Sequence, residues 1–238
     1  MNVLLFGATG MLGQAVLREC LLDPGVKAVL AVGRRASSQT HAKLRELEVP
    51  EVADLSPVEF ELTGYDACLF CLGVSSVGMS EERYTSLTYD LTLAVAETLA
   101  RLNPGMAFVY VSGMGTDSSE RGRVMWARVK GRTENALLRL PFRAAYMFRP
   151  ALIVPLHGVT SRTAWTRIGY AITKPLHPVL RSLFPGYVTT SEQFGRAMIR
   201  VARSGYVRPI LETTDINAIE TDTDQPALTA PDDREADG

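Results

Sequence analysis

The sequence is poor in the residues that define several protein classes. Its 238 residues include only three cysteines, Cys20, Cys68 and Cys71, which are too few and too irregularly spaced for a secreted disulfide framework. No apolar run approaches the roughly 18 residues that a membrane-spanning helix needs. The chain begins almost directly on the apolar run Val3–Phe6, without the basic segment and cleavage site of a secretory signal. We therefore expect a cytoplasmic protein.

Metal and hydrolase sites are also missing from the sequence. The three histidines are isolated and lack the spacing of metal ligands. Cys68 and Cys71 fall in a predicted strand, where residues three apart point to opposite faces, so we interpret them as core residues. The chain has no G-x-S-x-G turn and no paired carboxylates of a hydrolase. We expect no bound metal.

The net charge of −1 hides an uneven distribution. Residues 212–238 hold nine acids and one base, whereas residues 121–211 hold 16 bases and only two acids, Glu134 and Glu192. A basic half is typical of proteins that meet anionic ligands, lipid surfaces or nucleic acid, and equally of an ordinary solvated surface. No nucleic-acid module accompanies these bases, so we expect no nucleic-acid partner.

Short apolar runs alternate with segments of helical period over the first 155 residues. The predicted strands are Asn2–Phe6, Ala28–Val32, a weaker one at Glu48–Val52, Ala67–Cys71, Ala107–Val111 and Ala144–Phe148. The predicted helices between them are Met11–Leu22, Glu81–Leu102 and Val124–Leu138. Buried strands joined by helices predict an α/β fold with a doubly wound parallel sheet of the Rossmann type.

The pattern changes after Pro155. Residues 162–184 carry an apolar face opposite a basic one, which favours either helices that cap the sheet over a substrate pocket or an interfacial membrane helix. A helix at Ser191–Arg203 and a short strand at Arg208–Leu211 follow. We therefore predict one domain over residues 1–214, with a helical cap drawn from 156–211, and a disordered acidic tail over 215–238.

A glycine-rich turn joins the first strand to the first helix. Gly7, Gly10 and Gly13 form G-x-x-G-x-x-G, which permits a tight turn, close approach of a pyrophosphate, and close packing of helix on strand. The backbone N–H groups at the start of the helix, with its positive dipole end, suit phosphate binding. The predicted phosphate-binding residues are Gly7, Thr9, Gly10, Met11, Leu12 and Gly13.

The end of the second strand predicts the type of dinucleotide. An acid there would bind a ribose 2′-hydroxyl, but Arg34 and Arg35 follow instead. Guanidinium groups bind phosphate bidentately, so we predict NADP(H) over NAD(H). Asp54 and Leu55 follow the third strand; the Asp54 carboxylate fits either a contact with the adenine amino group or a helix cap, and both interpretations stay open.

The segments GATGMLGQ, AVGRR, CLGVSS, YVSGMGTDSS, VKGRTENAL and FRPALI, which fall within residues 1–155, carry a family resemblance. The chain resembles the atypical branch of the short-chain dehydrogenase/reductase superfamily, in particular the Tat-interacting-protein-like and epimerase/oxidoreductase-like group. The resemblance implies that Cys71, Leu72 and Gly73 pass close to the cofactor ribose, and that Arg149 and Pro150 lie near the nicotinamide.

In that family a serine orients the substrate oxygen, a tyrosine exchanges its proton, and a lysine four residues later holds the nicotinamide ribose. The resemblance assigns the first and last roles to Ser112 and Lys130, but Trp126 stands at the tyrosine position. An indole N–H donates a hydrogen bond and does not titrate usefully. Three outcomes follow: the chemistry is lost, Ser112 or a water carries the proton, or another tyrosine does, Tyr89 first among them.

Two functional hypotheses follow from these residues. The first is an NADP(H)-dependent oxidoreductase or epimerase-like enzyme for a small carbonyl or alcohol. The second is a non-catalytic, cofactor-bound protein that regulates or contacts another protein or a membrane. The resemblance also implies a homodimer through the two long helices. The identity of the substrate is not encoded in any motif of this chain.

Overall fold

The computed structural model describes residues 1–37, 39–157 and 186–221. Within these residues seven parallel strands form one sheet in the order β3-β2-β1-β4-β5-β6-β9. The strands are β1 (Asn2–Phe6), β2 (Ala28–Gly33), β3 (Leu44–Glu48), β4 (Ala67–Phe70), β5 (Ala107–Val111), β6 (Ala144–Arg149) and β9 (Ile210–Glu212). The chain crosses from one half of the sheet to the other between β1 and β4, where open α/β sheets bind ligands. The predicted doubly wound Rossmann-type fold is confirmed.

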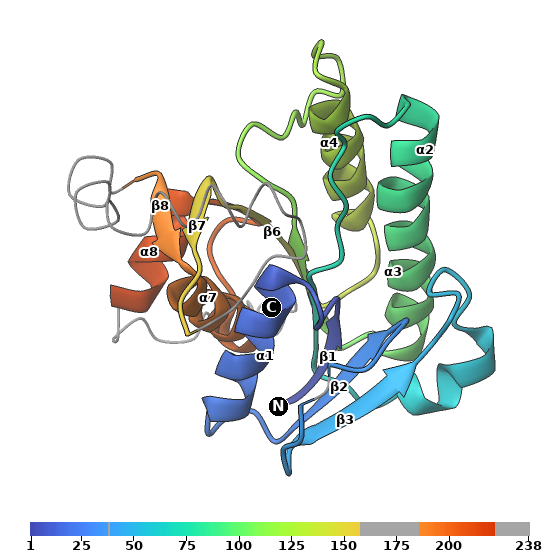
Figure 1. Cartoon of the computed structure of the whole chain (residues 1–238), viewed down its shortest axis with the longest axis vertical. Coiled ribbons are helices and arrows are strands. Elements are labelled where there is room, and N and C mark those ends of the chain that lie inside the picture. The colour runs from blue at the N-terminus through green and yellow to red at the C-terminus, as the bar shows by residue number, and fades with distance from the viewer. Residues whose placement is uncertain (38, 158–185, 222–238) are drawn as a thin grey trace, which may run out of the picture.

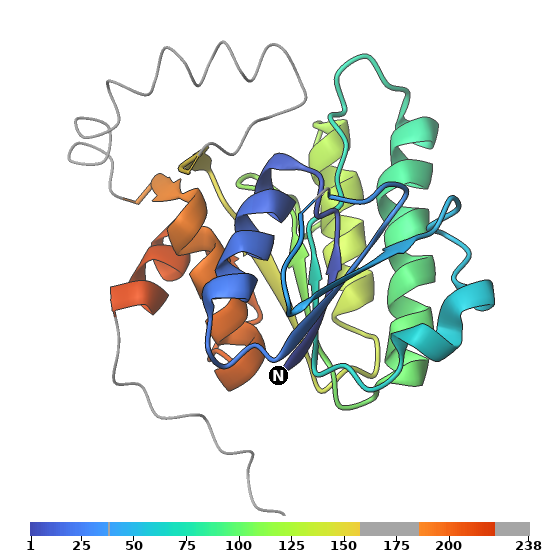
Figure 2. The same ribbon diagram turned by 60° about the horizontal axis from the view of Figure 1, so that its bottom comes forward.

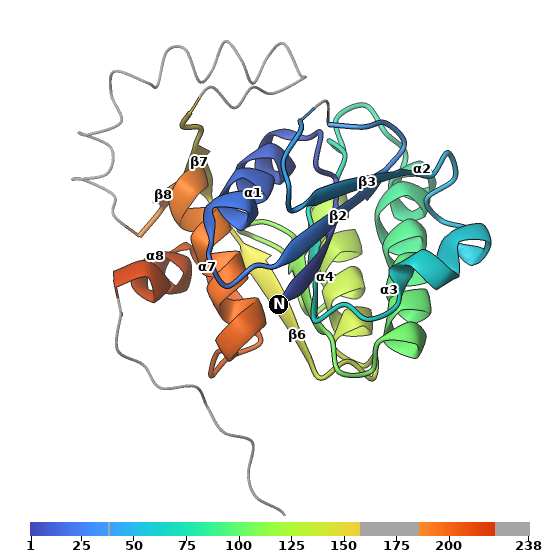
Figure 3. The same ribbon diagram turned by 90° about the horizontal axis from the view of Figure 1, so that it is seen from below.

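Helices cover both faces of this sheet. Figure 1 shows α1 (Met11–Leu22) and α7 (Ser191–Ser204) on one face, and α3 (Leu91–Leu102) and α4 (Met125–Leu137) on the other. The turned views in Figures 2 and 3 show the same three layers. Each face therefore has its own apolar core, and both cores are closed by helices that return the chain to the next strand.

Strand β1 shows how the sequence builds these two cores. Val3 and Leu5 pack with α1 and α7, while Leu4 and Phe6 pack with α3 and the aromatic side chains of β4 and β5. All four residues are fully buried. Because side chains of a strand alternate between faces, a continuous apolar run is what a strand buried on both sides requires.

The long helix expected at Glu81–Leu102 contains an irregular turn. It consists of α2 (Glu81–Thr85), the π-helical turn η2 (Ser86–Asp90) and α3 without a break. The turn η2 packs against α4. A π-turn adds a residue within a helix and is frequently found near functional sites.

The third strand lies earlier in the sequence than predicted. It spans Leu44–Glu48 rather than Glu48–Val52, and pairs only with β2. Its charged residues are tolerated because it is the edge of the sheet. The apolar residues Val49 and Val52 enter the core below α3 instead of extending the ladder. The 3-10 helix η1 (Ser56–Leu62), which was not predicted, follows them.

The C-terminal part differs from the predicted cap and tail. Helix α7 and strand β9 belong to the main layers, and the short strands β7 (Leu152–Val154) and β8 (Val188–Thr190) form a separate parallel pair. Disorder was predicted from Asp215, but α8 (Thr213–Thr221) begins before it and buries Ile216 and Ile219 against the core. The predicted amphipathic segment 162–184 and residues 222–238 lie outside the described residues. Within the described ranges, no helix is long and apolar enough to cross a membrane.

Candidate nucleotide and substrate site

The turn between β1 and α1 packs too tightly for side chains at two of its glycines. Gly7 has φ +86°, and a Cβ there would lie 2.8 Å from the backbone of Cys71. A Cβ at Gly13 would lie 1.9 Å from the carbonyl oxygen of Gly7. The helix therefore starts directly above the end of β1, with Gly10 as its N-cap and no side chain capping it. Its first N–H groups point to the carboxyl edge of the sheet, as a phosphate site requires.

A cavity of about 470 Å³ opens beside this turn. It is lined by Gly7, Ala8, Thr9, Ala31, Val32, Gly33, Arg34, Arg35, Ala36, Glu46, Leu47, Pro50 and Leu72. Its size is within the range of small-molecule sites in proteins. The structure thus brings the glycine turn, the end of β2 and the end of β4 to one cavity.

Arg34 and Arg35 are both exposed in this cavity, and the described residues provide neither side chain with an ion pair or hydrogen bond. One carboxylate lies in the same cavity, that of Glu46, whose Oε1 accepts a hydrogen bond from Ser37 N at 2.5 Å. Two unpaired guanidinium groups and a free helix N-terminus are donors suited to phosphate oxygens. The residues present therefore fit a dinucleotide with its phosphates in this cavity.

Asp54 and Leu55 do not line the cavity. Leu55 is buried in the core beside α3. The Asp54 carboxylate accepts hydrogen bonds from the Ser56 side chain and backbone at 2.7 and 3.1 Å, which lower its pKa. These bonds close the turn just before η1, whose N-cap is Leu55 and has no side-chain cap, so neither of the two interpretations left open for Asp54 is decided.

Of the three residues predicted after β4, some lie at the cavity and one faces solvent. Leu72 lines the cavity, and the Cys71 backbone lies against Gly7. Gly73 is exposed, with no atom within 4 Å of the place its Cβ would take. Burial raises the pKa of the Cys71 thiol to about 12. We therefore expect this thiol to stay protonated and inert.

Ser112 and Lys130 come together at the carboxyl end of β5. The Nζ of Lys130 donates to the carbonyl oxygen of Ser112 at 2.6 Å. Burial lowers the pKa of Lys130 to about 8, although Glu134 opposes this shift. The Ser112 hydroxyl donates to Glu134 Oε1 at 2.5 Å, with the Phe148 carbonyl oxygen at 3.2 Å. Both residues are thus fixed by internal hydrogen bonds.

Trp126 lies one helical turn before Lys130 on α4, and a Cβ at Gly115 would be 3.7 Å from its ring. Tyr89, the first alternative proton donor, is instead stacked on Arg132, whose guanidinium lies 4.1 Å from the ring centre. Residues two apart on a helix do not face the same side. Arg132 therefore holds Tyr89 away from the face of α4 that carries Lys130.

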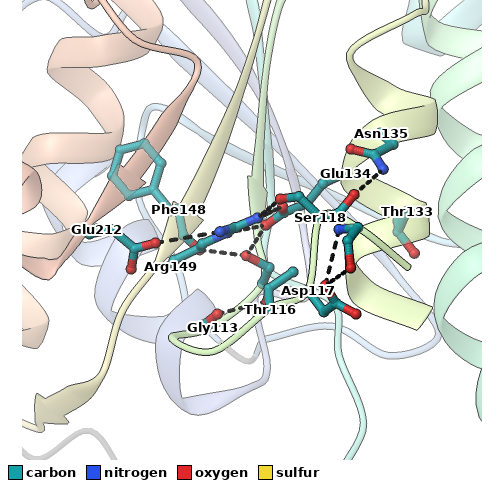
Figure 4. Close-up of polar contacts among 12 residues, drawn as sticks. Gly113, Thr116, Asp117, Ser118, Thr133, Glu134, Asn135, Phe148, Arg149 and Glu212 are labelled. Carbon is teal, nitrogen blue, oxygen red and sulfur yellow. Dashed lines mark hydrogen bonds and ion pairs between the residues drawn. The ribbon is translucent and has the colours of Figure 1, made fainter. Parts of the chain in front are cut away.

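Arg149 lies in a buried polar network that the sequence did not predict (Figure 4). Its Nε contacts both oxygens of Glu134 at 3.0 and 3.2 Å, and Nη2 contacts Glu134 Oε2 as well. Nη2 also donates to Ser118 Oγ at 2.5 Å, and Nη1 lies 3.5 Å from Glu212 Oε1. The resemblance placed Arg149 near the nicotinamide, but its Nε and Nη2 atoms bind protein groups in this structure.

One signal in the sequence pointed to this network. Glu134 follows Lys130 by four residues and is one of only two acids between residues 121 and 211. A lone acid on the same helix face as a predicted functional lysine is a candidate partner for it. Pro150 contributes only its backbone here, since its carbonyl oxygen accepts from Met114 N at 2.9 Å. The described residues contain no group of three or more potential metal ligands.

The sheet order, the glycine turn and the adjoining cavity define a class: a Rossmann-type protein with residues that fit a dinucleotide. Comparison with known proteins agrees. Residues 3–120 match the NAD dependent epimerase/dehydratase family. The chain is therefore similar to epimerase/dehydratase-like Rossmann proteins, and the resemblance noted from its sequence is confirmed.

Individual relatives support the same assignment. Protein fmp52, mitochondrial, from Emericella nidulans is 28% identical over 205 residues, which cover 83% of this chain and 85% of the relative. Protein HTATIP2 from Rattus norvegicus is 26% identical over 155 residues, 64% of this chain and 63% of the relative. The structure resembles that of the Bordetella bronchiseptica enzyme WbmF in complex with NAD+, with a TM-score of 0.63 and 14% identity, covering 96% of this chain and 81% of that one.

The comparison corrects one expectation. A cytoplasmic protein was expected because no targeting segment was recognised, but fmp52-type relatives, including the one from Emericella nidulans, are named as mitochondrial. The cytoplasmic prediction is therefore contradicted. The absence of a secretory signal excludes only one route, and it was too weak a basis for assigning a compartment.

Proposed function

We propose that the protein is an oxidoreductase or epimerase-like enzyme that uses NADP(H) in preference to NAD(H) and acts on a small carbonyl or alcohol. The observation that carries this proposal is the single cavity that joins the glycine turn to Arg34 and Arg35. The turn would hold the pyrophosphate, and the two guanidinium groups the 2′-phosphate. Glu46, in the same cavity, is the one feature there that would favour a free ribose hydroxyl and hence NAD(H).

Lys130 and Ser112 would act next to this dinucleotide. The nicotinamide supplies or accepts a hydride when bound. Lys130 would hold the ribose, and Ser112 would contact the substrate oxygen, both at the carboxyl end of β5 where ligands of such sheets bind. The relative positions of the two residues, joined through the Ser112 carbonyl oxygen, support this assignment.

Calorimetric titration with NADPH and NADH tests the cofactor. Each charge-assisted bond to the 2′-phosphate is worth about 1.5–3 kcal/mol, so we expect at least tenfold tighter binding of NADPH. Arg34→Ala should remove most of that preference. Arg45→Ala is a matched control, because Arg45 lies outside the cavity and pairs with Glu61 at 2.8 Å. Equal affinities for both dinucleotides in the unaltered protein would refute the NADP(H) preference.

A second candidate function rests on Trp126. Without a titratable group at this position, the protein would bind the dinucleotide and act as a regulatory or interaction protein. NADPH oxidation measured against a panel of aldehydes and quinones separates the two. Turnover that Ser112→Ala abolishes supports the enzyme, whereas tight NADPH binding with no turnover across the panel supports the non-catalytic protein.

A further inference from the structure

The hydrogen bonds of Ser112 determine whether its hydroxyl group can donate to or accept from a third partner. Its two neighbours within hydrogen-bond distance, the Glu134 carboxylate and the Phe148 carbonyl, can only accept. A hydroxyl group has one proton, and the shorter contact, 2.5 Å, assigns it to Glu134. The Ser112 oxygen therefore has only lone pairs left for a third partner.

Glu134 cannot easily turn away from Ser112. Its side chain is completely buried, and Arg149 donates hydrogen bonds to both of its carboxylate oxygens. Arg149 is in turn held by Ser118 from the loop after β5 and by Glu212 at the end of β9. The carboxylate is thus fixed by elements on both sides of it, as Figure 4 shows.

The side chain of Lys130, which lies beside Ser112, only donates. Its ammonium group offers N–H donors, one of which is committed to the Ser112 carbonyl oxygen. A substrate carbonyl oxygen only accepts and would face the lone pairs of Ser112. A substrate hydroxyl group can donate to Ser112 while it accepts from Lys130.

From this geometry we infer that Glu134 is a positioning residue that makes Ser112 a hydrogen-bond acceptor, so that the site selects a substrate that presents a hydroxyl group to Ser112. The inference deepens the proposed function and rests on its assignment of Ser112 to the substrate oxygen. It names the alcohol, rather than the carbonyl compound, as the form that the resting site recognises.

The bond itself is tested in the cofactor-free protein by proton NMR. A hydroxyl proton held between Ser112 and Glu134 exchanges slowly with solvent, so we expect a distinct hydroxyl resonance. Ser112→Ala should abolish this resonance. A Ser112 hydroxyl proton that exchanges freely would overturn the inference, whatever dinucleotide the protein binds.

The selectivity is tested with two probes in non-reacting combinations, cyclohexanol with NADPH and cyclohexanone with NADP+. Glu134→Asp keeps a charge beside Arg149 but draws the carboxylate back by about 1.5 Å, which frees the Ser112 proton. We expect cyclohexanol to bind the variant about tenfold more weakly, and cyclohexanone to bind it more tightly. Asn135→Ala, a neighbour on α4 that contacts Ser118 and Glu120 but not Ser112, should change neither affinity.

Opposite changes for the two probes are the result that a purely structural role of Glu134 would not produce. Equal weakening of both probes, no change in either, or no binding of cyclohexanol to the unaltered complex would each overturn the inference. Failure of the proposed function is seen separately, as the absence of heat on titration with NADPH. Thermal unfolding of Glu134→Asp establishes that the variant is folded.

Discussion

In the glycine-rich turn between β1 and α1, the space for a single Cβ atom decides which glycines can be replaced. Gly10 and Gly13 belong to the same motif, yet a Cβ at Gly10 would meet its nearest neighbour at 3.4 Å and one at Gly13 at 1.9 Å. Gly13 is therefore required by the close packing of α1 on the turn that follows β1. Gly10 has room for a Cβ, so the approach of a ligand is the main reason for a glycine there. The spacing of the motif does not distinguish these two requirements.

We predict that Gly13→Ala destabilises the fold by about 3 kcal/mol or more, because backbone atoms of Gly7 must move to admit the methyl group. Thermal or urea unfolding measures the change. Gly73→Ala is the control, since the place its Cβ would take is open, and its stability should match the unaltered protein within about 0.5 kcal/mol. Equal stability of the two variants would contradict the packing described for the turn.

Lys130 makes stability depend on pH. In the folded protein burial lowers its pKa to about 8, whereas an unfolded chain keeps it near about 10.4. Between these values the unfolded state binds more protons, so stability rises with pH. We expect the unaltered protein to gain up to about 3 kcal/mol relative to Lys130→Met between pH 7 and 10.5. A constant difference between the two proteins in urea unfolding would show that Lys130 titrates normally.

For individual residues, the sequence predicted positions that depend on backbone geometry or that directly follow a strand. Gly7, Arg34, Arg35 and Leu72 meet at one cavity because parallel strands end at the same edge. It could not predict which polar side chains partner one another. Arg149 was expected to face a ligand, and only the folded chain shows that Glu134 neutralises it.

Among the elements, the loop after β5 depends most on its neighbour. The loop crosses α4 at Gly131, where a Cβ would lie 1.8 Å from the carbonyl oxygen of Asp117. The Asp117 carboxylate accepts hydrogen bonds from Ser119 and Gly122, which lower its pKa and close the loop on itself. The helix thus determines where Ser118 stands relative to Arg149.

We predict that Gly131→Ala pushes this loop off α4 and costs about 1–3 kcal/mol of stability. Loss of the Ser118–Arg149 contact should follow, visible as faster hydrogen exchange in the loop. Gly105→Ala, at a turn with open space around it, provides the comparison. Unchanged exchange in the loop of Gly131→Ala would contradict the contact.

Periodicity predicted most elements because their burial is regular, and it failed where burial is not. Strand β3 is an edge strand whose charged residues hide its alternation. The π-turn at Ser86–Asp90 changes the period within one helix. Helix α8 is short and acidic, and only two isoleucines three residues apart indicate its buried side. Tertiary contacts define all three elements.

For the molecule as a whole, α8 completes the core that α1 and α7 share. We predict that Ile216→Ala lowers the free energy of unfolding by about 2–4 kcal/mol, since this side chain is fully buried. Val207→Ala, at a residue that is 74% exposed, should cost less than about 0.5 kcal/mol. Matching unfolding curves for the two variants would mean that α8 does not contribute to the fold in solution.

Part of the basic charge of residues 121–211 is paired with acids in the described part of the chain. Arg196 pairs with Glu192 and Glu19, Arg203 with Asp23, and Arg208 with Asp215. Two of these pairs are distant in sequence, since Arg196 and Arg203 of α7 contact Glu19 in α1 and Asp23 directly after it. Because these arginines are paired, a formal count of bases overstates what is available to an outside anion.

The chain contains only two tryptophans, and one of them, Trp126, lies beside Gly115 in the loop after β5. At the position of the family tyrosine, this side chain thus places an intrinsic fluorophore one turn of α4 before Lys130, the residue that we propose holds the nicotinamide ribose. With the other tryptophan changed to phenylalanine, its emission would report, without any label, on whatever enters the space above the sheet.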